Sequence, residues 1–386
     1  MRIAFFSTMG SSPWGGSEEL WSRAASVLLA RGHDVCVNYR TWPEPPEPLQ
    51  RLIRAGAKVC WRRRPWVGRS IRRAVQKASI GRYRFAGWLL RAKPDFVLVS
   101  VGLHTDELPV AQTCHALGVS YGILVQAATS TQWIEPRNLM QFREAYRRAE
   151  RLFFVSEQNR EILESNLSLD LSHAEIVDNP FNVRADARPP WPSAQSTWKL
   201  ACVARLHFPS KGQDILLRLL CWPKWRGRPL QIAFWGEDNG SLRQAQQWVD
   251  LHDLHRQVTF GGVATDIESL WSRHHGLVLP SRYEGNSLAM TEAMLSGRVP
   301  IVTNIGRAAE LIDDNRSGFV APAATVELVD DALERAWQRR RKWQAIGALA
   351  AQAIRSRHSL RPAEDFADRL LTSDSSRQHL HQLAAA

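Results

Sequence analysis

The sequence has few cysteines, and their arrangement excludes two common kinds of site. The five cysteines among 386 residues are odd in number, widely spaced and form no Cys-x-x-Cys pair. This argues against a disulfide framework and against a structural zinc site. Cys36, Cys114 and Cys202 lie in or beside apolar segments, so we expect them to be buried thiols. With no Asp-x-Asp motif in a metal-ligand context either, the sequence predicts no bound metal.

Long apolar runs are also missing. No stretch approaches the roughly 18 residues that span a bilayer, and the segment after Met1 lacks the apolar core and cleavage site of a secretory signal. We therefore expect a soluble, cytoplasmic protein. Lysine occurs at only seven positions, so arginine carries most of a net charge of +12. That charge admits nucleic acid, anionic membrane or phosphorylated substrates as partners without choosing among them.

The length and the hydrophobic pattern predict two α/β domains. A chain of 386 residues exceeds the size at which a single core keeps growing. Short β-branched or aromatic runs alternate with helical patterns, which is typical of βα units and parallel sheets. The predicted strands cover residues 3–7, 35–39, 96–100, 121–125, 152–155, 200–203, 231–235, 258–260, 276–279 and 299–302. Helices are predicted over 18–30 and 138–149, and almost throughout 325–371.

A proline-rich stretch separates the two alternating patterns, and we interpret residues 182–197 as the linker. The first, acceptor-side domain is then expected over 1–181 and the nucleotide-sugar-binding domain over 198–355. Residues 356–386 are predicted to form a C-terminal helix and tail that pack back on the first domain.

The segment 279–294 carries the most informative pattern, Leu-Pro-Ser-Arg-Tyr-Glu-Gly-Asn-Ser-Leu-Ala-Met-Thr-Glu-Ala-Met. A strand is expected to end at Pro280 and a helix to begin near Ser287, a favourable N-cap residue. Free amides and the helix dipole favour phosphate at this edge of a parallel sheet. Glu284 precedes the helix and Glu292 lies about one turn inside it, so they should reach different parts of one extended ligand. A solvated helical face is the alternative interpretation of this pair.

Arg205 and Lys211 stand six residues apart across a second strand-to-helix loop. Two such cations can converge on a diphosphate, since arginine offers a bidentate fork and lysine a point charge. The alternative is two surface cations in a basic protein. His207, between them, is expected to be an exposed loop residue without a role.

A glycine pair, Gly15 and Gly16, joins the first predicted strand to its helix. Paired glycines permit close approach of the backbone to a ligand. The loop is not the dinucleotide fingerprint GxGxxG, and a simple turn with Ser17 capping the helix would explain it equally well.

The frame Pro-Ser-x-x-Glu-Gly-x-x-x-x-x-x-Glu-Ala-Met closely resembles glycosyltransferase family 4 of the GT-B fold. The run 297–302, and Glu310 followed by 317–319, continue the resemblance. It implies two Rossmann-like, doubly wound parallel-sheet domains with an interdomain cleft and a helical C-terminus. It also implies retaining, metal-independent transfer from a nucleotide-diphosphate-sugar donor to a carbohydrate or lipid-linked acceptor, in glycan or glycolipid biosynthesis, with no further cofactor.

The resemblance assigns roles to individual residues. Glu284 would contact the donor sugar, Glu292 the ribose hydroxyls, and Arg205 with Lys211 the diphosphate. The remaining donor-binding positions that it implies are Gly285, Asn286, Ser287, Leu288, Gly15, Gly16, Gly236 and Val263.

Two positions depart from the family pattern. Gln126 replaces a histidine near the anomeric carbon, and glutamine can hydrogen-bond a hydroxyl but cannot titrate near neutrality. The pair Asn286-Ser287 replaces the commoner aromatic-glycine pair, which leaves the donor sugar open. His104 is a candidate acceptor contact or an incidental loop residue.

Arginines interleaved with aromatic residues fill the segment 61–91. This composition suits peripheral contact with anionic lipid on the inner face of the cytoplasmic membrane, or a solvated helical face with its tryptophans packed inward. No nucleic-acid-binding frame accompanies it, so no nucleic acid is expected. The alternatives to a transferase are a non-catalytic nucleotide-sugar-binding protein and a GT-B sugar-nucleotide epimerase.

Overall fold

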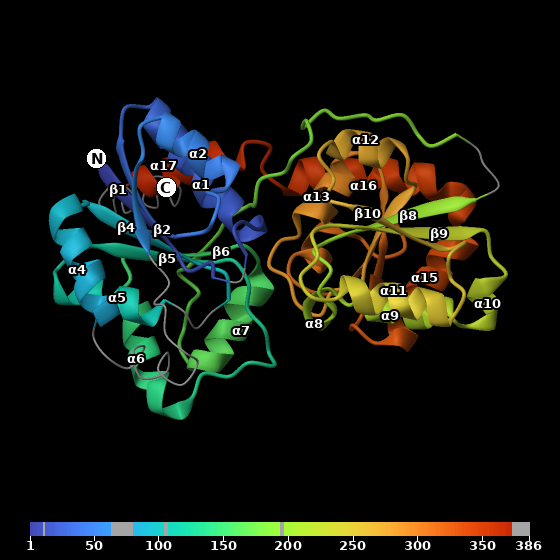
Figure 1. Ribbon diagram of the computed structural model, residues 1–386, viewed down its shortest axis with the longest axis horizontal. Helices are drawn as coiled ribbons and strands as arrows, with labels where there is room; N and C mark the ends of the chain where they lie inside the picture. The colour runs from blue at the N-terminus through green and yellow to red at the C-terminus, as the bar shows by residue number, and fades with distance from the viewer. Residues whose placement is uncertain (11, 63–79, 104–106, 194–196, 373–386) are drawn as a thin grey trace, which may run out of the picture. The chain divides into compact units, whose positions relative to one another are not determined.

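The chain folds into two units, each built on one parallel sheet (Figure 1). The computed structural model describes residues 1–10, 12–62, 80–103, 107–193 and 197–372. The first unit comprises Met1–Pro180 and the segment that begins at Arg361, and the second comprises Phe181–Leu360. The predicted linker residues from 182 on are thus part of the second unit, and the last described helix belongs to the first.

The first unit holds a parallel sheet in the order β3-β2-β1-β4-β5-β6-β7. Its strands are β1 (Arg2–Ser7), β2 (Asp34–Arg40), β3 (Lys58–Arg62), β4 (Phe96–Val101), β5 (Tyr121–Val125), β6 (Arg151–Phe154) and β7 (Glu175–Ile176). The order reverses beside β1, which is the doubly wound pattern that the sequence predicts. The five strands predicted for this half are all present, whereas β3 and β7 were not predicted.

Helices cover both faces of this sheet, with α1, α2 and α17 on one side and α4 to α7 on the other (Figure 1). They are α1 (Gly16–Ala30), α2 (Glu47–Arg54), α4 (Ile80–Ala92), α5 (Leu108–Ala116), α6 (Pro136–Arg147), α7 (Glu157–Leu167) and α17 (Pro362–Leu371). The C-terminal helix α17 packs on α1, and the ring of Phe366 lies edge-on to Phe153 at 5.1 Å between centroids. The last described helix therefore contributes to the core of the first unit.

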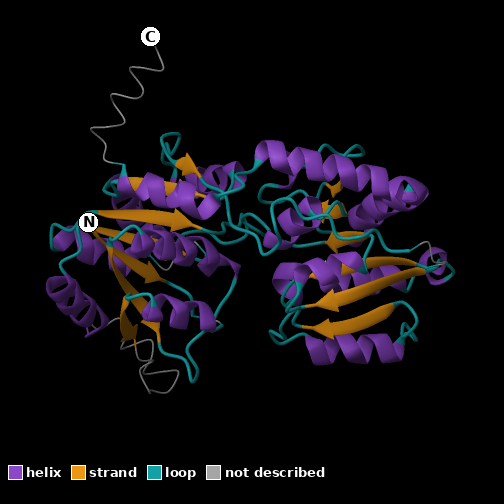
Figure 2. Cartoon of the chain, turned by 90° about the horizontal axis from the view of Figure 1, so that it is seen from above, coloured by secondary structure: helices purple, strands orange, loops and turns teal. Residues whose placement is uncertain are grey.

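The second unit repeats the architecture with the strand order β10-β9-β8-β11-β12-β13. Its strands are β8 (Trp198–Val203), β9 (Leu230–Trp235), β10 (Val258–Gly262), β11 (Gly276–Leu279), β12 (Val299–Thr303) and β13 (Phe319–Ala321). In each sheet the strands run side by side in one direction (Figure 2). Since carboxyl ends of parallel strands meet at one edge, the loops after β8 to β11 are neighbours.

The helices of the second unit lie in two layers, α9, α11 and α15 on one face and α12, α13 and α16 on the other (Figure 1). They are α8 (Phe208–Lys211), α9 (Gln213–Leu220), α10 (Pro223–Arg226), α11 (Leu242–Leu251), α12 (Ile267–Ser272), α13 (Leu288–Leu295), α14 (Ala308–Leu311), α15 (Val326–Gln338), the 3-10 helix η1 (Arg340–Lys342) and α16 (Trp343–Arg357). Side-chain caps start several of them, for example Asp266 at α12 and Thr325 at α15. The predicted helical C-terminus is confirmed.

The cysteine prediction is confirmed for the three residues that it named, since Cys36, Cys114 and Cys202 are buried free thiols. Burial raises the pKa of the Cys114 and Cys202 thiols to about 12, so both are inert at neutral pH. In the part of the chain that the structure describes, no helix has both the length and the apolar character to cross a bilayer.

Candidate donor site at the carboxyl edge of the second sheet

The loop between β11 and α13 forms as the sequence predicts. Ser287 is the N-cap of α13, and its hydroxyl accepts a hydrogen bond from the Met290 amide at 3.4 Å. Glu284 lies on the loop before the helix, whereas Glu292 lies inside it and is only 3% exposed. Glu284 and Ser287 line the same small cavity at the carboxyl end of β11. The two glutamates therefore occupy different environments, and a solvated helical face does not describe them.

Lys211 and Glu284 form a close ion pair. The Lys211 ammonium donates to Glu284 Oε1 at 2.6 Å, and both side chains are less than a fifth exposed. The Ser281 hydroxyl donates to the same oxygen at 2.9 Å. Lys211 and Glu284 are thus direct partners although they stand 73 positions apart in the sequence. The sequence pattern assigned them to different parts of the donor.

Three features of the chain bring these two loops together. Gly212 follows Lys211 with a φ of +68°, and a Cβ at this position would lie 2.0 Å from the carbonyl oxygen of Pro280. Only glycine allows this approach. The Arg282 amide donates to the Ser210 carbonyl at 2.8 Å, and its guanidinium binds Asp214 through two 2.8 Å hydrogen bonds. Arg282 therefore positions the Lys211 loop, a role the sequence pattern did not assign.

The loop after β8 is ordered by its own contacts. The carbonyl oxygen of Arg205 accepts from the Gln213 side chain at 2.8 Å, and Leu206 bridges to Asp238 after β9. The prediction that His207 is an exposed loop residue is wrong. Its ring is half-buried, its Nδ1 lies 2.7 Å from the Ser210 hydroxyl, and burial lowers its pKa. Lys211 ends the one-turn helix α8 rather than starting the long helix that follows.

Glu292 is held by a residue that the sequence analysis placed in the linker. Its Oε1 accepts two hydrogen bonds from Asn182, one from the backbone amide and one from the side-chain amide, both at 2.9 Å. Because Glu292 is buried, these bonds fix the direction of its carboxylate. Asn182 is therefore part of the site, although it stands 110 positions from Glu292 in the sequence.

The other predicted donor-side residues lie along the same edge in varied settings. The Gly236 amide donates to the Gly262 carbonyl at 2.7 Å, so only its carbonyl remains for a ligand. Val263 is 65% exposed, an apolar side chain at the end of β10. Asn286 is buried, and its side-chain amide lies 3.3 Å from His358 Nε2. Gly285 and Leu288 flank this residue and the helix cap.

In the first unit, Gln126 follows β5 and is 5% exposed. Its Oε1 accepts from the Asn179 side-chain amide at 3.1 Å. Its Nε2 is buried and has no hydrogen-bond partner in the described part of the chain. A buried donor without a partner is costly, so this amide is suited to a ligand oxygen at the carboxyl edge of the first sheet.

The glycine loop of the first unit rests on aromatic side chains. Gly15 is the N-cap of α1 and Gly16 is its first residue, so the alternative in which Ser17 caps the helix is wrong. The Trp14 indole donates to Glu19 at 2.7 Å, and the Tyr39 hydroxyl donates to the Pro13 carbonyl at 2.7 Å. The rings of Trp14, Trp21 and Tyr39 lie about 6 Å apart. These contacts hold in place the loop that leads into α1.

A buried ionisable cluster lies next to this loop. Glu18, in the first turn of α1, is 1% exposed, and burial raises its pKa to about 7. The Trp21 indole donates to Glu18 Oε2 at 3.1 Å. Arg62 at the end of β3 donates to Asn38 and to the Ser7 carbonyl, and burial lowers its pKa to about 10. The glycine loop is therefore followed by the Glu18 carboxyl group, whose pKa is about 7.

This cluster gives a pH-dependent stability. Burial raises the pKa of folded Glu18 to about 7, whereas the pKa of an unfolded glutamate is about 4.3. The free energy of unfolding should therefore fall as pH rises through that window and level off above it, by on the order of 3 kcal/mol. In urea unfolding between pH 5 and 8, Glu18→Gln should gain stability relative to the wild type as pH rises. The exposed Glu44→Gln variant is the control, and parallel profiles for all three proteins would contradict the expectation.

Some predicted features are only partly described. His104 and residues 63–79 of the basic segment lie outside the described residues. Where the structure describes the side-chain burial of aromatic residues in this segment, Phe85 and Trp88 are buried in the core of the first unit, whereas Trp61 is 37% exposed. Of these tryptophans, Trp88 packs inward and Trp61 does not. Among the described residues, no group of three or more His, Cys, Asp or Glu is placed to hold a metal ion.

Comparison with known families gives one match in each unit. The model described as "Glycosyltransferase Family 4" matches residues 14–184. The model described as "Glycosyl transferases group 1" matches residues 197–339. Both models describe glycosyltransferases, and each matches less than half of the chain. The donor-side residues Arg205, Lys211, Glu284 and Glu292 all fall within the second match.

Individual relatives are similar over parts of their length. The chain is 29% identical to the sucrose synthase of Nitrosomonas europaea over 147 residues, 35% of this chain and 18% of that protein. It is 31% identical to a GDP-mannose-dependent alpha-(1-6)-phosphatidylinositol monomannoside mannosyltransferase of Mycobacterium tuberculosis over 169 residues, 40% of this chain and 42% of the relative. The chain thus matches less than half of either relative.

Solved structures agree over nearly the whole chain and establish the fold. Anabaena Alr3699/HepE, in complex with UDP, superposes with a TM-score of 0.73 at 16% identity, covering 96% of this chain and 99% of the other. The sucrose-phosphate synthase of Thermosynechococcus elongatus covers both chains completely with a TM-score of 0.71, also at 16% identity. The GT-B fold that the sequence predicts is confirmed.

Proposed function

We propose that this protein is a retaining glycosyltransferase that moves a sugar from a nucleoside diphosphate sugar to an acceptor. The observation that carries the proposal is the Lys211–Glu284 pair at 2.6 Å, beside the N-terminus of α13. In the proposed complex, the ammonium binds the diphosphate and the adjacent carboxylate binds the sugar. The family matches in both units support the same reaction.

The pair suggests how the residues divide the work. When a donor binds, the Lys211 ammonium exchanges the Glu284 carboxylate for a phosphate oxygen, and Glu284 is left to accept hydrogen bonds from sugar hydroxyls. Arg205 adds a bidentate donor to the diphosphate. As the glycosidic bond breaks, negative charge grows on the leaving diphosphate, and the two cations stabilise it. Glu284 stabilises the positive charge that develops near the anomeric carbon.

The remaining residues hold the donor and the acceptor. Glu292, directed by Asn182, binds the ribose hydroxyls, and the exposed Val263 contacts the base. In the first unit, Gln126 Nε2 has no hydrogen-bond partner among the described residues and is available to a sugar oxygen, and the Gly15-Gly16 loop is available to a phosphate or to the acceptor. The mannosyltransferase relative, whose name specifies phosphatidylinositol monomannoside, supports a lipid-linked acceptor. An acceptor of this kind would be met on the cytoplasmic face of a membrane, where we propose that the protein acts.

The test begins with the nucleotide. UDP, GDP and ADP should be titrated against the full chain by calorimetry, since UDP occupies the HepE structure and the mannosyltransferase relative uses GDP-mannose. The matching donor sugars are then incubated with candidate acceptors, and NMR of the product gives the anomeric configuration. Retention supports the proposal. Nucleotide binding without transfer or donor hydrolysis would indicate a non-catalytic nucleotide-sugar-binding protein instead.

We expect the reaction to be independent of divalent metal. Arg205, Lys211 and the N-terminus of α13 already supply positive charge at the leaving group, which is the task that a metal performs in other transferases. Turnover should therefore be unchanged after dialysis against excess chelator. Loss of turnover that magnesium or manganese restores would contradict this expectation.

Asn182→Ala should weaken recognition of the ribose. The variant removes one of the two hydrogen bonds that Asn182 donates to the buried Glu292, so affinity for the nucleotide should fall about three- to tenfold. Asn182→Asp, which sets a second carboxylate against Glu292, should lose more. The specific readout is the ratio of affinities for the ribonucleotide and its 2′-deoxy form. That ratio should shrink in both variants, and a wild-type ratio would show that Asn182 acts on stability alone.

A further inference from the structure

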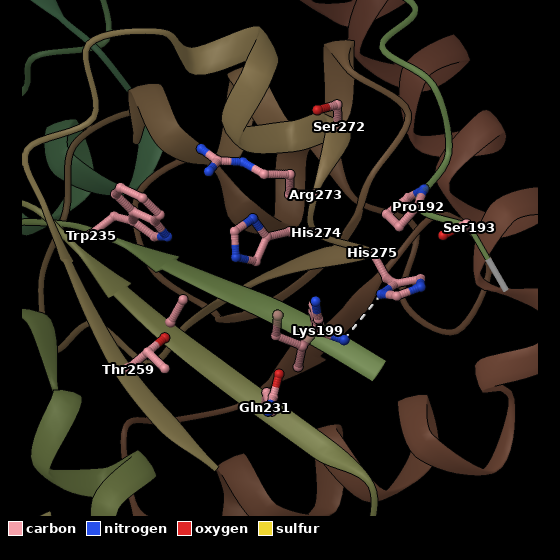
Figure 3. A pocket seen from close by; sticks show the side chains of 12 residues that line it. Pro192, Ser193, Lys199, Gln231, Trp235, Thr259, Ser272, Arg273, His274 and His275 are labelled. Carbon is pink, nitrogen blue, oxygen red and sulfur yellow. Dashed lines mark hydrogen bonds between the residues drawn. The ribbon is translucent and has the colours of Figure 1, made fainter. Parts of the chain in front are cut away.

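The second unit contains an open cleft of about 400 Å³ that is separate from the candidate donor residues. It lies over the face of the sheet formed by β8, β9 and β10, on the side of the short helix α12 (Figure 3). None of the residues assigned to the donor lines it. The volume is within the range of small-molecule sites in proteins.

Trp235 at the end of β9 forms one wall of the cleft, and its position depends on a glycine. A Cβ at Gly261 on the neighbouring strand would lie 2.4 Å from the Trp235 ring, so only glycine leaves room for the indole to cross β10. The indole Nε1 is buried and has no hydrogen-bond partner in the described part of the chain. Burying an N–H group without an acceptor costs free energy, so this indole N–H is suited to donate to a ligand.

The charges around the cleft are of one sign. Lys199 and Arg273 line it, and neither makes a salt bridge with any described residue. The Arg273 guanidinium lies 5.6 Å from the centre of the Trp235 ring. No carboxylate is among the described residues that line the cleft. An anionic group would therefore meet two cations and no like charge.

Two histidines add a donor and an acceptor. Both line the cleft, and burial lowers their pKa, that of His275 to about 4, so both are neutral. His274 Nδ1 donates to the Leu270 carbonyl at 2.8 Å, which leaves Nε2 as an acceptor. His275 Nδ1 accepts from the Lys199 amide at 3.0 Å, which leaves Nε2–H as a donor. Hydroxyl groups, which both donate and accept, match this combination.

We propose that the cleft is a binding site for a phosphorylated sugar. The sugar ring lies against Trp235, its hydroxyls bond to the indole N–H and the two histidines, and its phosphate binds Lys199 and Arg273. The site differs from the donor site in its residues and in its place on the sheet, so it is independent of the proposed transfer reaction.

The test is calorimetric titration of glucose 6-phosphate into the full chain, with glucose and inorganic phosphate as separate probes. The titration is repeated with the donor site saturated by whichever nucleoside diphosphate binds, and again in Lys211→Ala. Glucose 6-phosphate should bind equally in all three cases and more tightly than either fragment. Replacing both cations, Lys199→Gln with Arg273→Gln, should weaken it by about tenfold or more.

Matched variants make the outcome specific. Arg243→Gln removes an exposed arginine of α11, outside the cleft, and should leave affinity unchanged. Trp235→Phe keeps an aromatic ring over Gly261 but removes the indole N–H, and should cost about three- to tenfold. The proposal is overturned if no heat is detected, if inorganic phosphate binds as tightly as the sugar phosphate, or if nucleotide or Lys211→Ala abolishes binding.

Discussion

Glu284→Gln should lower turnover by about 100-fold or more while affinity for the free nucleoside diphosphate does not fall. The carboxylate is expected to act on charge that develops near the anomeric carbon, so its loss removes stabilisation that is stronger in the transition state than in the ground state. A free nucleoside diphosphate has no sugar and should not need Glu284. The measurement is steady-state turnover together with calorimetric titration of the diphosphate.

The structure sharpens this expectation. Glu284 and the diphosphate compete for the Lys211 ammonium, which lies 2.6 Å from Glu284 Oε1. Removing the carboxylate charge should therefore leave diphosphate affinity equal to or higher than that of the wild type. Glu327→Gln, at an exposed carboxylate of α15, controls for the loss of one negative charge. A variant that loses diphosphate affinity and keeps turnover would show that Glu284 and Glu292 have each other's roles.

The sequence predicted those parts of the site that depend on local patterns. Ser287 caps α13 because a serine stands immediately before the helix, and a cap of this kind is visible in a few residues of sequence. The same segment predicted that Glu284 and Glu292 differ in setting. The fold class followed from the alternation of short apolar runs with helical patterns. These features need no knowledge of long-range contacts.

The parts that were missed depend on residues distant in sequence. Asn182 bonds Glu292 across 110 positions, and Asn179 bonds Gln126 across 53. Asn182 stands at the start of the segment that we interpret as the linker, and Asn179 stands just before it. Strand β3 was missed because Lys58–Arg62 lacks a clean apolar pattern, yet it delivers the buried Arg62. One local signal was the glycine pair at the end of β10, where Gly261 makes room for Trp235.

The two cations provide the last prediction. Arg205→Ala and Lys211→Ala each remove charge-assisted hydrogen bonds worth about 1.5 to 3 kcal/mol, so affinity for the nucleoside diphosphate should fall roughly 10- to 100-fold. Lys211→Ala should be the larger loss, because it also leaves the largely buried Glu284 carboxylate unpaired beside the diphosphate. Arg218→Ala and Lys342→Ala, at exposed cations away from the loop, should change little.

The double variant Lys211→Ala with Glu284→Gln separates the two contributions to the Lys211 effect. If part of the loss comes from the stranded carboxylate, neutralising it should restore part of the diphosphate affinity, whereas turnover should stay low because Glu284 is missing. Calorimetry on the wild type, both single variants and the double variant gives the coupling directly. If the changes in diphosphate affinity of the two single variants add up to that of the double variant, Lys211 and Glu284 act on the diphosphate independently. Unchanged diphosphate affinity in both Arg205→Ala and Lys211→Ala would remove these cations from the donor site altogether.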